Sequence, residues 1–150
     1  MPMAIDGTVA VSTSSTDVST LLKDAIAAYS DGRADDAERL SRRLLAQQPD
    51  HVAGLQIMAA LAGQTGRLPL ALQIVRKAVS LQPDLVSAHI QLANLLRQEG
   101  NCSGATEELN IALRLQPDNA DAHNDLGLVH LAESHFHRPS YFFADALQLN

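Results

Sequence analysis

Six histidines among 150 residues are the first candidates for chemistry, because imidazole binds metal ions and transfers protons. His123 and His130 are seven residues apart, so one face of a helix would carry both, and His135 and His137 follow closely. Protein zinc sites usually contain a His-Glu-x-x-His or Cys-x-x-Cys element, and neither element occurs here. We therefore expect no metal site and no cofactor.

Cys102 and the segment 63–67 are the remaining candidates for catalysis or phosphate binding. Cys102 is the only cysteine, and no histidine or second cysteine is positioned beside it to make a nucleophile. The segment 63–67, Gly-Gln-Thr-Gly-Arg, lacks the Lys-Ser/Thr ending of a phosphate loop and follows an expected helix instead of a strand. We predict no catalytic residue, and a protein that is not an enzyme.

The charged residues argue against two classes of partner. There are 17 acidic and 11 basic residues, and the one basic cluster is Arg39, Arg42 and Arg43. We interpret this cluster as a solvated helix face, with docking of an acidic partner as the alternative. No apolar run reaches the roughly 18 residues that span a bilayer, and residues 1–22 contain no Lys or Arg for a signal peptide. We expect a cytoplasmic protein that contacts neither nucleic acid nor membrane.

A repeat of 34 residues organises the sequence. Gln-Pro-Asp occurs at 48–50, 82–84 and 116–118, and Gly32, Gly66 and Gly100 recur at the same interval. Proline ends a helix, and a glycine midway between prolines supplies the left-handed residue that terminates one helix before the next. Each unit is therefore predicted to be a helix, a turn, a second helix and a stop.

Four units aligned on this period share residue types at fixed places, counted from Val18, Val52, Val86 and Ala120. The pattern resembles that of the tetratricopeptide repeat, in which close helix approach requires small residues at the eighth and twentieth places. The places that carry the resemblance hold Leu21, Leu55, His89 and His123 (fourth), Ala25, Ala59, Ala93 and Gly127 (eighth), and Ala37, Ala71, Ala105 and Pro139 (twentieth).

The resemblance implies an all-α fold, a right-handed α-solenoid of four tetratricopeptide-type helix-turn-helix repeats. The repeats would cover 18–51, 52–85, 86–119 and 120–150, in a domain of residues 17–150 that follows a flexible N-terminal tail, residues 1–16. Pro139 would be tolerated in the first turn of the last helix, since its missing N–H has no intrahelical partner there. Helices are expected at 17–30, 34–47, 52–64, 68–81, 86–98, 102–115, 120–133 and 138–149.

In the resembled family the first helix of each unit lines a concave groove, with its second, fifth, ninth and twelfth places pointing inward. Apolar and amide side chains at these places can hold a peptide. For any one apolar residue, the alternative is packing against the tail or an adjacent helix. The residues that we predict to bind the partner are Leu22, Ile26, Tyr29, Gln56, Ala60, Ile90, Asn94, Arg97, Asn124 and Leu128.

The expected function is a non-catalytic protein–protein interaction scaffold that binds a protein or peptide segment in this groove. Relatives that capture chaperone C-termini carry a cationic clamp, where this chain has Leu22, Ile26 and Ile90, so such a partner is disfavoured. The alternative is an N-terminal substrate-recognition region of a larger enzyme such as a glycosyltransferase or sulfotransferase, because similar repeats precede such domains. Ile57 and Gln91 at the sixth places do not match the asparagine ladder of O-linked N-acetylglucosamine transferases.

Aromatic residues are concentrated near the C-terminal end, at Phe136, Tyr141, Phe142 and Phe143. A terminal solenoid repeat without a polar capping helix exposes an apolar flank, and exposed apolar surface promotes association. We expect a homo-oligomer through the C-terminal repeats, with Phe142 and Leu147 in the contact. The alternative is a monomer in which both side chains fold back onto the last helix pair.

Overall fold

The structure is built from helices. The computed structural model describes the backbone of residues 16–148 and the side chains of residues 16–135. Within residues 16–148 there are seven α-helices and no strand, which confirms the predicted all-α class. The helices are α2 (Val18–Ser30), α3 (Ala34–Gln47), α4 (Val52–Gln64), α5 (Leu68–Leu81), α6 (Val86–Glu99), α7 (Cys102–Leu115) and α8 (Ala120–Gln148).

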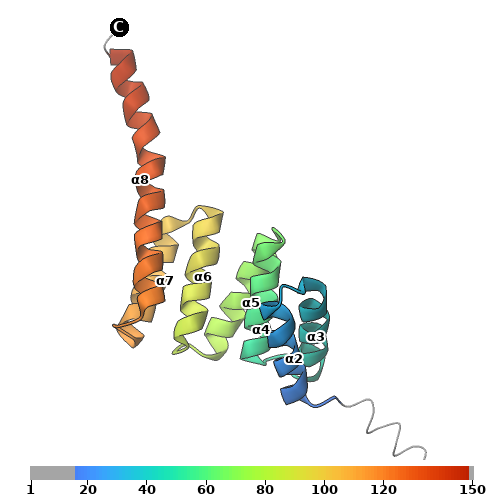
Figure 1. Ribbon diagram of the computed structural model, residues 1–150. Coiled ribbons are helices and arrows are strands. Elements are labelled where there is room, and N and C mark those ends of the chain that lie inside the picture. Colours follow the sequence, from blue (N-terminus) through green and yellow to red (C-terminus); the bar gives the residue numbers. More distant parts are fainter. Residues whose placement is uncertain (1–15, 149–150) are drawn as a thin grey trace, which may run out of the picture.

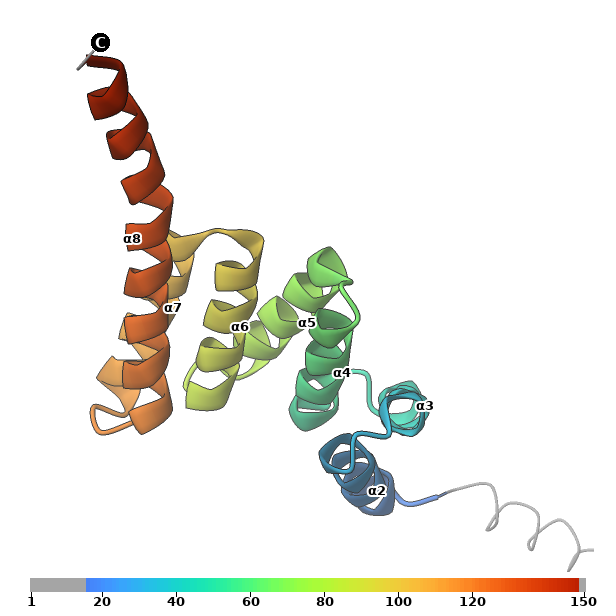
Figure 2. The same ribbon diagram turned by 45° about the horizontal axis from the view of Figure 1, so that its top comes forward.

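The helices stack as hairpins along one direction (Figure 1). The first helices contact one another in the order α2, α4, α6, α8, whereas each second helix contacts only its own hairpin and the first helix that follows. In Figure 2, α2 and α3 are seen nearly end-on while α8 lies in the plane of view, so the hairpins turn progressively along the stack. Each unit thus contacts only its neighbours, as in a solenoid.

Three left-handed glycines form the turns inside the hairpins. Gly32, Gly66 and Gly100 have φ angles of 76°, 77° and 91°, in a region that residues with a Cβ rarely adopt. In each turn the N–H of the next residue donates to a carbonyl five residues earlier, over 2.8 Å. The pairs are Arg33 with Ala28, Arg67 with Ala62, and Asn101 with Leu96. This bond satisfies a carbonyl at the end of the first helix and reverses the chain.

The fourth unit differs from the prediction. Separate helices over 120–133 and 138–149 were wrong, because the structure has one helix, α8, from Ala120 to Gln148. The residue 34 positions after Gly100 is Ser134, and the left-handed conformation costs an L-residue about 1–2 kcal/mol that glycine does not incur. The helix therefore continues through the place of the turn. Pro139 consequently lies in its interior instead of in a first turn.

The core of each hairpin is a seam of small and medium-sized side chains. Six places of each unit form what we call the hairpin seam. The fourth, eighth and eleventh places lie on the first helix, and the 20th, 24th and 27th places lie on the second helix. In the first three units every seam residue is at most 5% exposed. These residues are Leu21, Ala25, Ala28, Ala37, Ser41 and Leu44; Leu55, Ala59, Ala62, Ala71, Val75 and Ala78; and His89, Ala93, Leu96, Ala105, Leu109 and Ala112.

Two histidines at the fourth place contact the proline turn that precedes their helix. The Nε2 atom of buried His89 lies 2.7 Å from the carbonyl oxygen of Pro83, and its Nδ1 atom lies 2.7 Å from Oε2 of Glu108. One unit later, Nε2 of His123 lies 2.9 Å from the carbonyl oxygen of Pro117. Since a carbonyl oxygen only accepts, Nε2–H is the donor in both cases. Both histidines therefore have a structural role.

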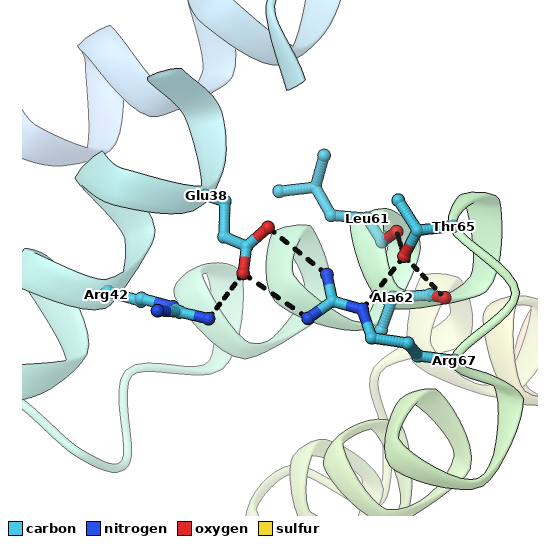
Figure 3. A network of polar contacts seen from close by, with 6 residues as sticks. All are labelled: Glu38, Arg42, Leu61, Ala62, Thr65 and Arg67. Atoms are coloured by element: carbon cyan, nitrogen blue, oxygen red, sulfur yellow. Dashed lines mark hydrogen bonds and ion pairs between the residues drawn. The ribbon is translucent and has the colours of Figure 1, made fainter. Parts of the chain in front are cut away.

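A polar network joins the first hairpin to the second (Figure 3). The carboxylate of Glu38 accepts a hydrogen bond from Arg42 at 2.6 Å and two from Arg67 at 3.2 and 3.4 Å. Arg67 also donates from Nε to the hydroxyl of Thr65 over 3.0 Å. The hydrogen bond from Arg67 is the main reason that the pKa of Glu38 lies below its ordinary value near 4.5. Deprotonated Glu38 therefore stabilises the fold.

Replacing Glu38 by Gln should remove a pH-dependent part of the stability. Because the folded pKa is below the unfolded pKa, the contribution is complete above the unfolded value and is lost as the pH falls through the folded pKa. In urea unfolding we expect Glu38→Gln to lower the free energy of unfolding by about 1 kcal/mol at neutral pH, and by less below about pH 4. Exposed Glu107, replaced by Gln, is the control. A difference between wild type and Glu38→Gln that is independent of pH would contradict this account.

Gly54 and Gly127 should respond in opposite directions to alanine. A Cβ on Gly54 in α4 would overlap Cδ2 of Leu44 in α3, whereas a Cβ on Gly127 would meet no atom of the described residues within 4 Å. Alanine is favoured over glycine in a helix by about 0.5–1 kcal/mol, so Gly127→Ala should stabilise the protein by that amount. Gly54→Ala should destabilise it by about 1–3 kcal/mol through overpacking. Urea unfolding measures both, and a stabilised Gly54→Ala would argue against the close contact of α3 with α4.

Candidate binding groove

The first helices α2, α4 and α6 together form a hollowed face. Two hollows, of about 570 and 390 Å³, lie along it. Tyr29, Ala60, Ser87 and Gln91 line both, so we treat the two hollows as one groove. The other lining residues are Ile26, Ala53, Gln56, Ile57, Gly63, Gln64, Ile90, Asn94, Leu95, Arg97 and Gln98.

Small residues on α4 keep the centre of the groove open. The ninth and twelfth places of the second unit are Ala60 and Gly63, so α4 has no long side chain at these two places. A Cβ on Gly63 would lie 2.8 Å from Cδ2 of Leu95 in α6, so the two helices approach closely here. Larger side chains, Tyr29 from α2 and Ile90 from α6, contribute to the lining on either side.

Seven of the ten residues predicted to bind the partner line this groove, namely Ile26, Tyr29, Gln56, Ala60, Ile90, Asn94 and Arg97. The other three lie outside it: Leu22 is half-buried on α2, Asn124 is exposed on α8, and Leu128 is 40% exposed on α8. Phe142 and Leu147 fall in the part of α8 whose side chains the structure does not describe. The groove is therefore formed by the first three units.

Sequence reasoning missed Ile57, Gln64, Gln91, Leu95 and Gln98 as lining residues. All but Leu95 occupy the sixth and thirteenth places, next to the fifth and twelfth places that were used for the prediction. Places seven apart lie on one face of a helix, so a wider stripe of the same face would have included these four residues.

Most amide side chains of the groove are bonded to a neighbouring first helix. Gln56 Nε2 donates to Ser87 Oγ over 3.0 Å, and Gln64 Nε2 donates to the Tyr29 hydroxyl over 3.0 Å. Two further bonds of this kind are Gln91 Nε2 to the carbonyl oxygen of Gln56, at 2.7 Å, and Asn94 Nδ2 to Asp125 Oδ2, at 2.8 Å. These bonds hold successive units in register, so the amides contribute to the scaffold as well as to the surface.

Among the described residues, Arg97 is the only charged one that lines the groove. Its Nε atom is buried and has no hydrogen-bond partner among the described residues, and the same holds for Oε1 of Gln91 on the same helix. A guanidinium recognises carboxylates through paired N–H donors, and an amide oxygen accepts a peptide N–H. The α6 side of the groove therefore offers one cationic donor group, the guanidinium of Arg97, to a ligand.

The other candidate residues do not assemble into a site in the described part of the chain. No group of three or more His, Cys, Asp and Glu side chains is arranged there to hold a metal ion. Cys102 is buried in the core, at 9% exposure. Residues 63–67 end α4 and form the turn at Gly66, as predicted. None of the described helices is long and apolar enough to cross a membrane.

The arginine cluster of α3 is bonded within the first hairpin and to Thr16, two residues before α2. Arg39 donates to Asp36, Arg42 to Glu38 and Arg43 to the Thr16 hydroxyl, at 2.8, 2.6 and 3.1 Å. All three arginines are exposed. This arrangement supports the interpretation of the cluster as a solvated helix face.

Comparison with known proteins identifies the repeat. Residues 22–85 match a family described as tetratricopeptide repeat, and residues 93–133 match one described as TPR repeat. Among solved structures, a mutant of the Thermobaculum terrenum O-GlcNAc transferase is 33% identical over 75% of this chain, with a TM-score of 0.73. This chain spans 22% of the length of that enzyme. No curated protein matches the sequence significantly.

Two further structures are similar at lower identity. The first TPR of Spaghetti (RPAP3), bound to the HSP90 peptide SRMEEVD, is 17% identical with a TM-score of 0.72, over 78% of this chain and 93% of that one. A mutant of MamA is 24% identical with a TM-score of 0.64, over 90% and 78% of the two chains. At these identities the likeness concerns the fold alone.

The chain belongs to the tetratricopeptide repeat family. Its 34-residue period, its stacked helical hairpins and both matched regions agree on this assignment. The predicted α-solenoid of tetratricopeptide type is therefore confirmed, with three closed hairpins followed by the single long helix α8 in residues 16–148.

The Asn94–Asp125 bond should couple the third unit to α8. Because this part-buried bond joins two units, we expect a double-mutant cycle of Asn94→Ala and Asp125→Ala to give a coupling energy of about 0.5–1.5 kcal/mol in urea unfolding. A cycle of Asn94→Ala with Asn124→Ala is the control and should give about zero. Equal coupling in both cycles would show that the bond does not hold the two units together.

Proposed function

We propose that this protein is a non-catalytic scaffold whose groove binds an extended polypeptide segment that carries a carboxylate. The observation behind the proposal is that, among the described residues, Arg97 is the one charged residue in a groove otherwise lined by neutral side chains. The chain has a net charge of -6, so it does not attract anions in general. One cation in a neutral groove selects where an acidic group binds.

The dimensions of the groove suit an extended segment. Packed helices lie about 8–10 Å apart, so three first helices span about 20 Å between the outer axes. An extended chain covers that span with about six residues. In our proposal Ile26, Tyr29 and Ile90 contact apolar side chains of the segment, and the guanidinium of Arg97 binds the carboxylate.

A structural neighbour supports this mode of binding. The first TPR of Spaghetti (RPAP3) is bound to the HSP90 peptide SRMEEVD, which contains acidic residues. This chain has Leu22 and Ile90 where chaperone-binding relatives carry the lysines of a cationic clamp, and Ile26 where they carry an asparagine. We therefore propose a different register, with the acidic group at Arg97. Leu22, Asn124 and Leu128 would contact the ends of a ligand longer than the groove.

Selection from a phage-displayed library of random peptides about eight residues long tests this function. Wild type should enrich peptides with an Asp or Glu at a fixed spacing from apolar residues. Arg97→Gln should lose this acidic preference and bind the enriched peptides about tenfold more weakly, because a charge-assisted hydrogen bond contributes about 1.5–3 kcal/mol. Arg76→Gln is the matched control, since Arg76 is exposed on α5 outside the groove.

Two results would contradict the proposal. One is enrichment without any acidic preference in wild type, and the other is equal affinity of wild type and Arg97→Gln for the enriched peptides. Both results would leave the fold assignment unchanged, because the assignment depends on the repeat and not on the ligand.

A second function is favoured by one comparison. The O-GlcNAc transferase neighbour is 33% identical, and this chain corresponds to 22% of that enzyme. These repeats would then form the substrate-recognition region of a larger enzyme. An immunoblot of the source cells with an antibody against the repeats distinguishes the two functions. A band much larger than 16.1 kDa would favour the enzyme, and a band at that mass the scaffold.

A further inference from the structure

The larger hollow of the groove contains a row of three residues at the twelfth places of the first helices. Tyr29 belongs to α2, Gly63 to α4 and Arg97 to α6, and all three line this hollow of about 570 Å³. Because Gly63 has no side chain, the row has a gap at its centre. An aromatic side chain lies on one side of this gap and a cation on the other.

The side chain of Tyr29 is held in place by two contacts. Its ring is partly buried against a small core cluster of Ala28, Ala37 and Leu61. Its hydroxyl oxygen lies 3.0 Å from Nε2 of Gln64 on α4, the helix at the centre of the groove. The ring and the hydroxyl oxygen are therefore positioned before a ligand binds, which lowers the ordering cost of binding.

The hydrogen bond from Gln64 determines what the Tyr29 hydroxyl can do. An amide N–H only donates, so the hydroxyl oxygen is the acceptor in this bond. A phenolic hydroxyl also carries one hydrogen of its own, which the bond from Gln64 does not use. The Tyr29 O–H can thus donate to an acceptor in the hollow that it lines. Accepting one hydrogen bond also strengthens the hydroxyl as a donor, since bonded groups polarise one another.

Arg97 supplies a second donor group from the opposite side of the hollow. Its Nε atom is buried, whereas the residue as a whole is half-buried. The terminal NH2 groups are therefore the part of the guanidinium that a ligand can reach. The axes of α2 and α6 are two helix spacings apart, or about 16–20 Å. Tyr29 and Arg97 have the longest side chains in the lining, so together they narrow this distance most.

We propose that the Tyr29 O–H and the Arg97 guanidinium form a two-donor site over Gly63 that binds the ligand carboxylate, with Gln64 directing the Tyr29 hydrogen into the site. The ligand is the acidic segment of the proposed function, on which this site therefore rests. A carboxylate has two acceptor oxygens, so one oxygen can accept from each donor. Gln64 is a positioning residue, because it acts through Tyr29.

A two-donor site selects a carboxylate over an amide. An amide group has one acceptor oxygen, and its NH2 group only donates. Between two donors, an amide directs its NH2 group at one of them, so one of the two hydrogen bonds is lost. Both Tyr29 and Arg97 therefore contribute to the preference for an acidic residue, and removal of either donor should reduce that preference.

The affinities of two synthetic peptides measure the preference. One peptide has a sequence that wild type enriches from the random library, with an amidated C-terminus, and the other has Asn or Gln in place of its Asp or Glu. Fluorescence anisotropy gives both affinities and hence their ratio. We expect Tyr29→Phe, which removes only the hydroxyl oxygen, to lower this ratio about three- to tenfold. Thr106→Val removes a hydroxyl on α7 outside the groove and should leave the ratio unchanged.

A double-mutant cycle tests the role of Gln64. Gln64→Leu alone should lower the ratio about threefold, and in a Tyr29→Phe protein it should lower the ratio no further. A merely structural role of Gln64 would weaken both peptides equally and leave the ratio unchanged. A raised ratio in Gln64→Leu would show that the hydroxyl donates to Gln64 instead of to the ligand. Either result would overturn the proposal.

Arg97→Gln separates this site from the proposed function. A lowered ratio in Arg97→Gln together with an unchanged ratio in Tyr29→Phe would overturn the two-donor site and leave the proposed function standing. An unchanged ratio in both variants, or a wild type without acidic preference, would overturn both. A lowered ratio in both variants, with equal far-ultraviolet circular dichroism of all proteins, would support the two-donor site.

Discussion

The architecture depends on one backbone conformation, a left-handed residue placed every 34 positions. Where glycine supplies it, at Gly32, Gly66 and Gly100, a carbonyl of the first helix is bonded and the second helix returns along the first. Where Ser134 stands instead, the helix continues to Gln148. The type of a single residue thus determines whether a unit closes.

The closed hairpins bring the first helices together, and this close packing creates the groove. Small seam residues let each pair of helices approach closely, and Ala60 and Gly63 keep the middle of the groove open. Bonds such as Gln56 to Ser87 and Asn94 to Asp125 then fix neighbouring first helices relative to one another. A groove held in this way is organised before a ligand binds, which lowers the ordering cost of binding. Arg97 provides the charge in this organised surface.

The first three units could be predicted from sequence because their signals are local. Proline and glycine at fixed intervals mark helix ends, and α3, α4, α5 and α7 have the predicted limits, while α2 and α6 differ by one residue at one end. The fourth unit was mispredicted because its period was extended without weighing the absence of glycine at position 134. The groove was predicted in outline from the helix face. The hydrogen bonds of the groove could not be predicted, because pairs such as Asn94 and Asp125, which are 31 residues apart, depend on the exact stacking of the helices.

The most direct test of this account is the backbone conformation around Ser134 in solution, from NMR chemical shifts and amide–Hα couplings of the 150-residue chain. The three turns at Gly32, Gly66 and Gly100 provide internal references with positive φ. We expect uninterrupted helical values from residue 130 to residue 138. A turn at Ser134, with non-helical values followed by a new helix that shows contacts to Gly127, would contradict the claim that the left-handed glycine determines whether a hairpin closes.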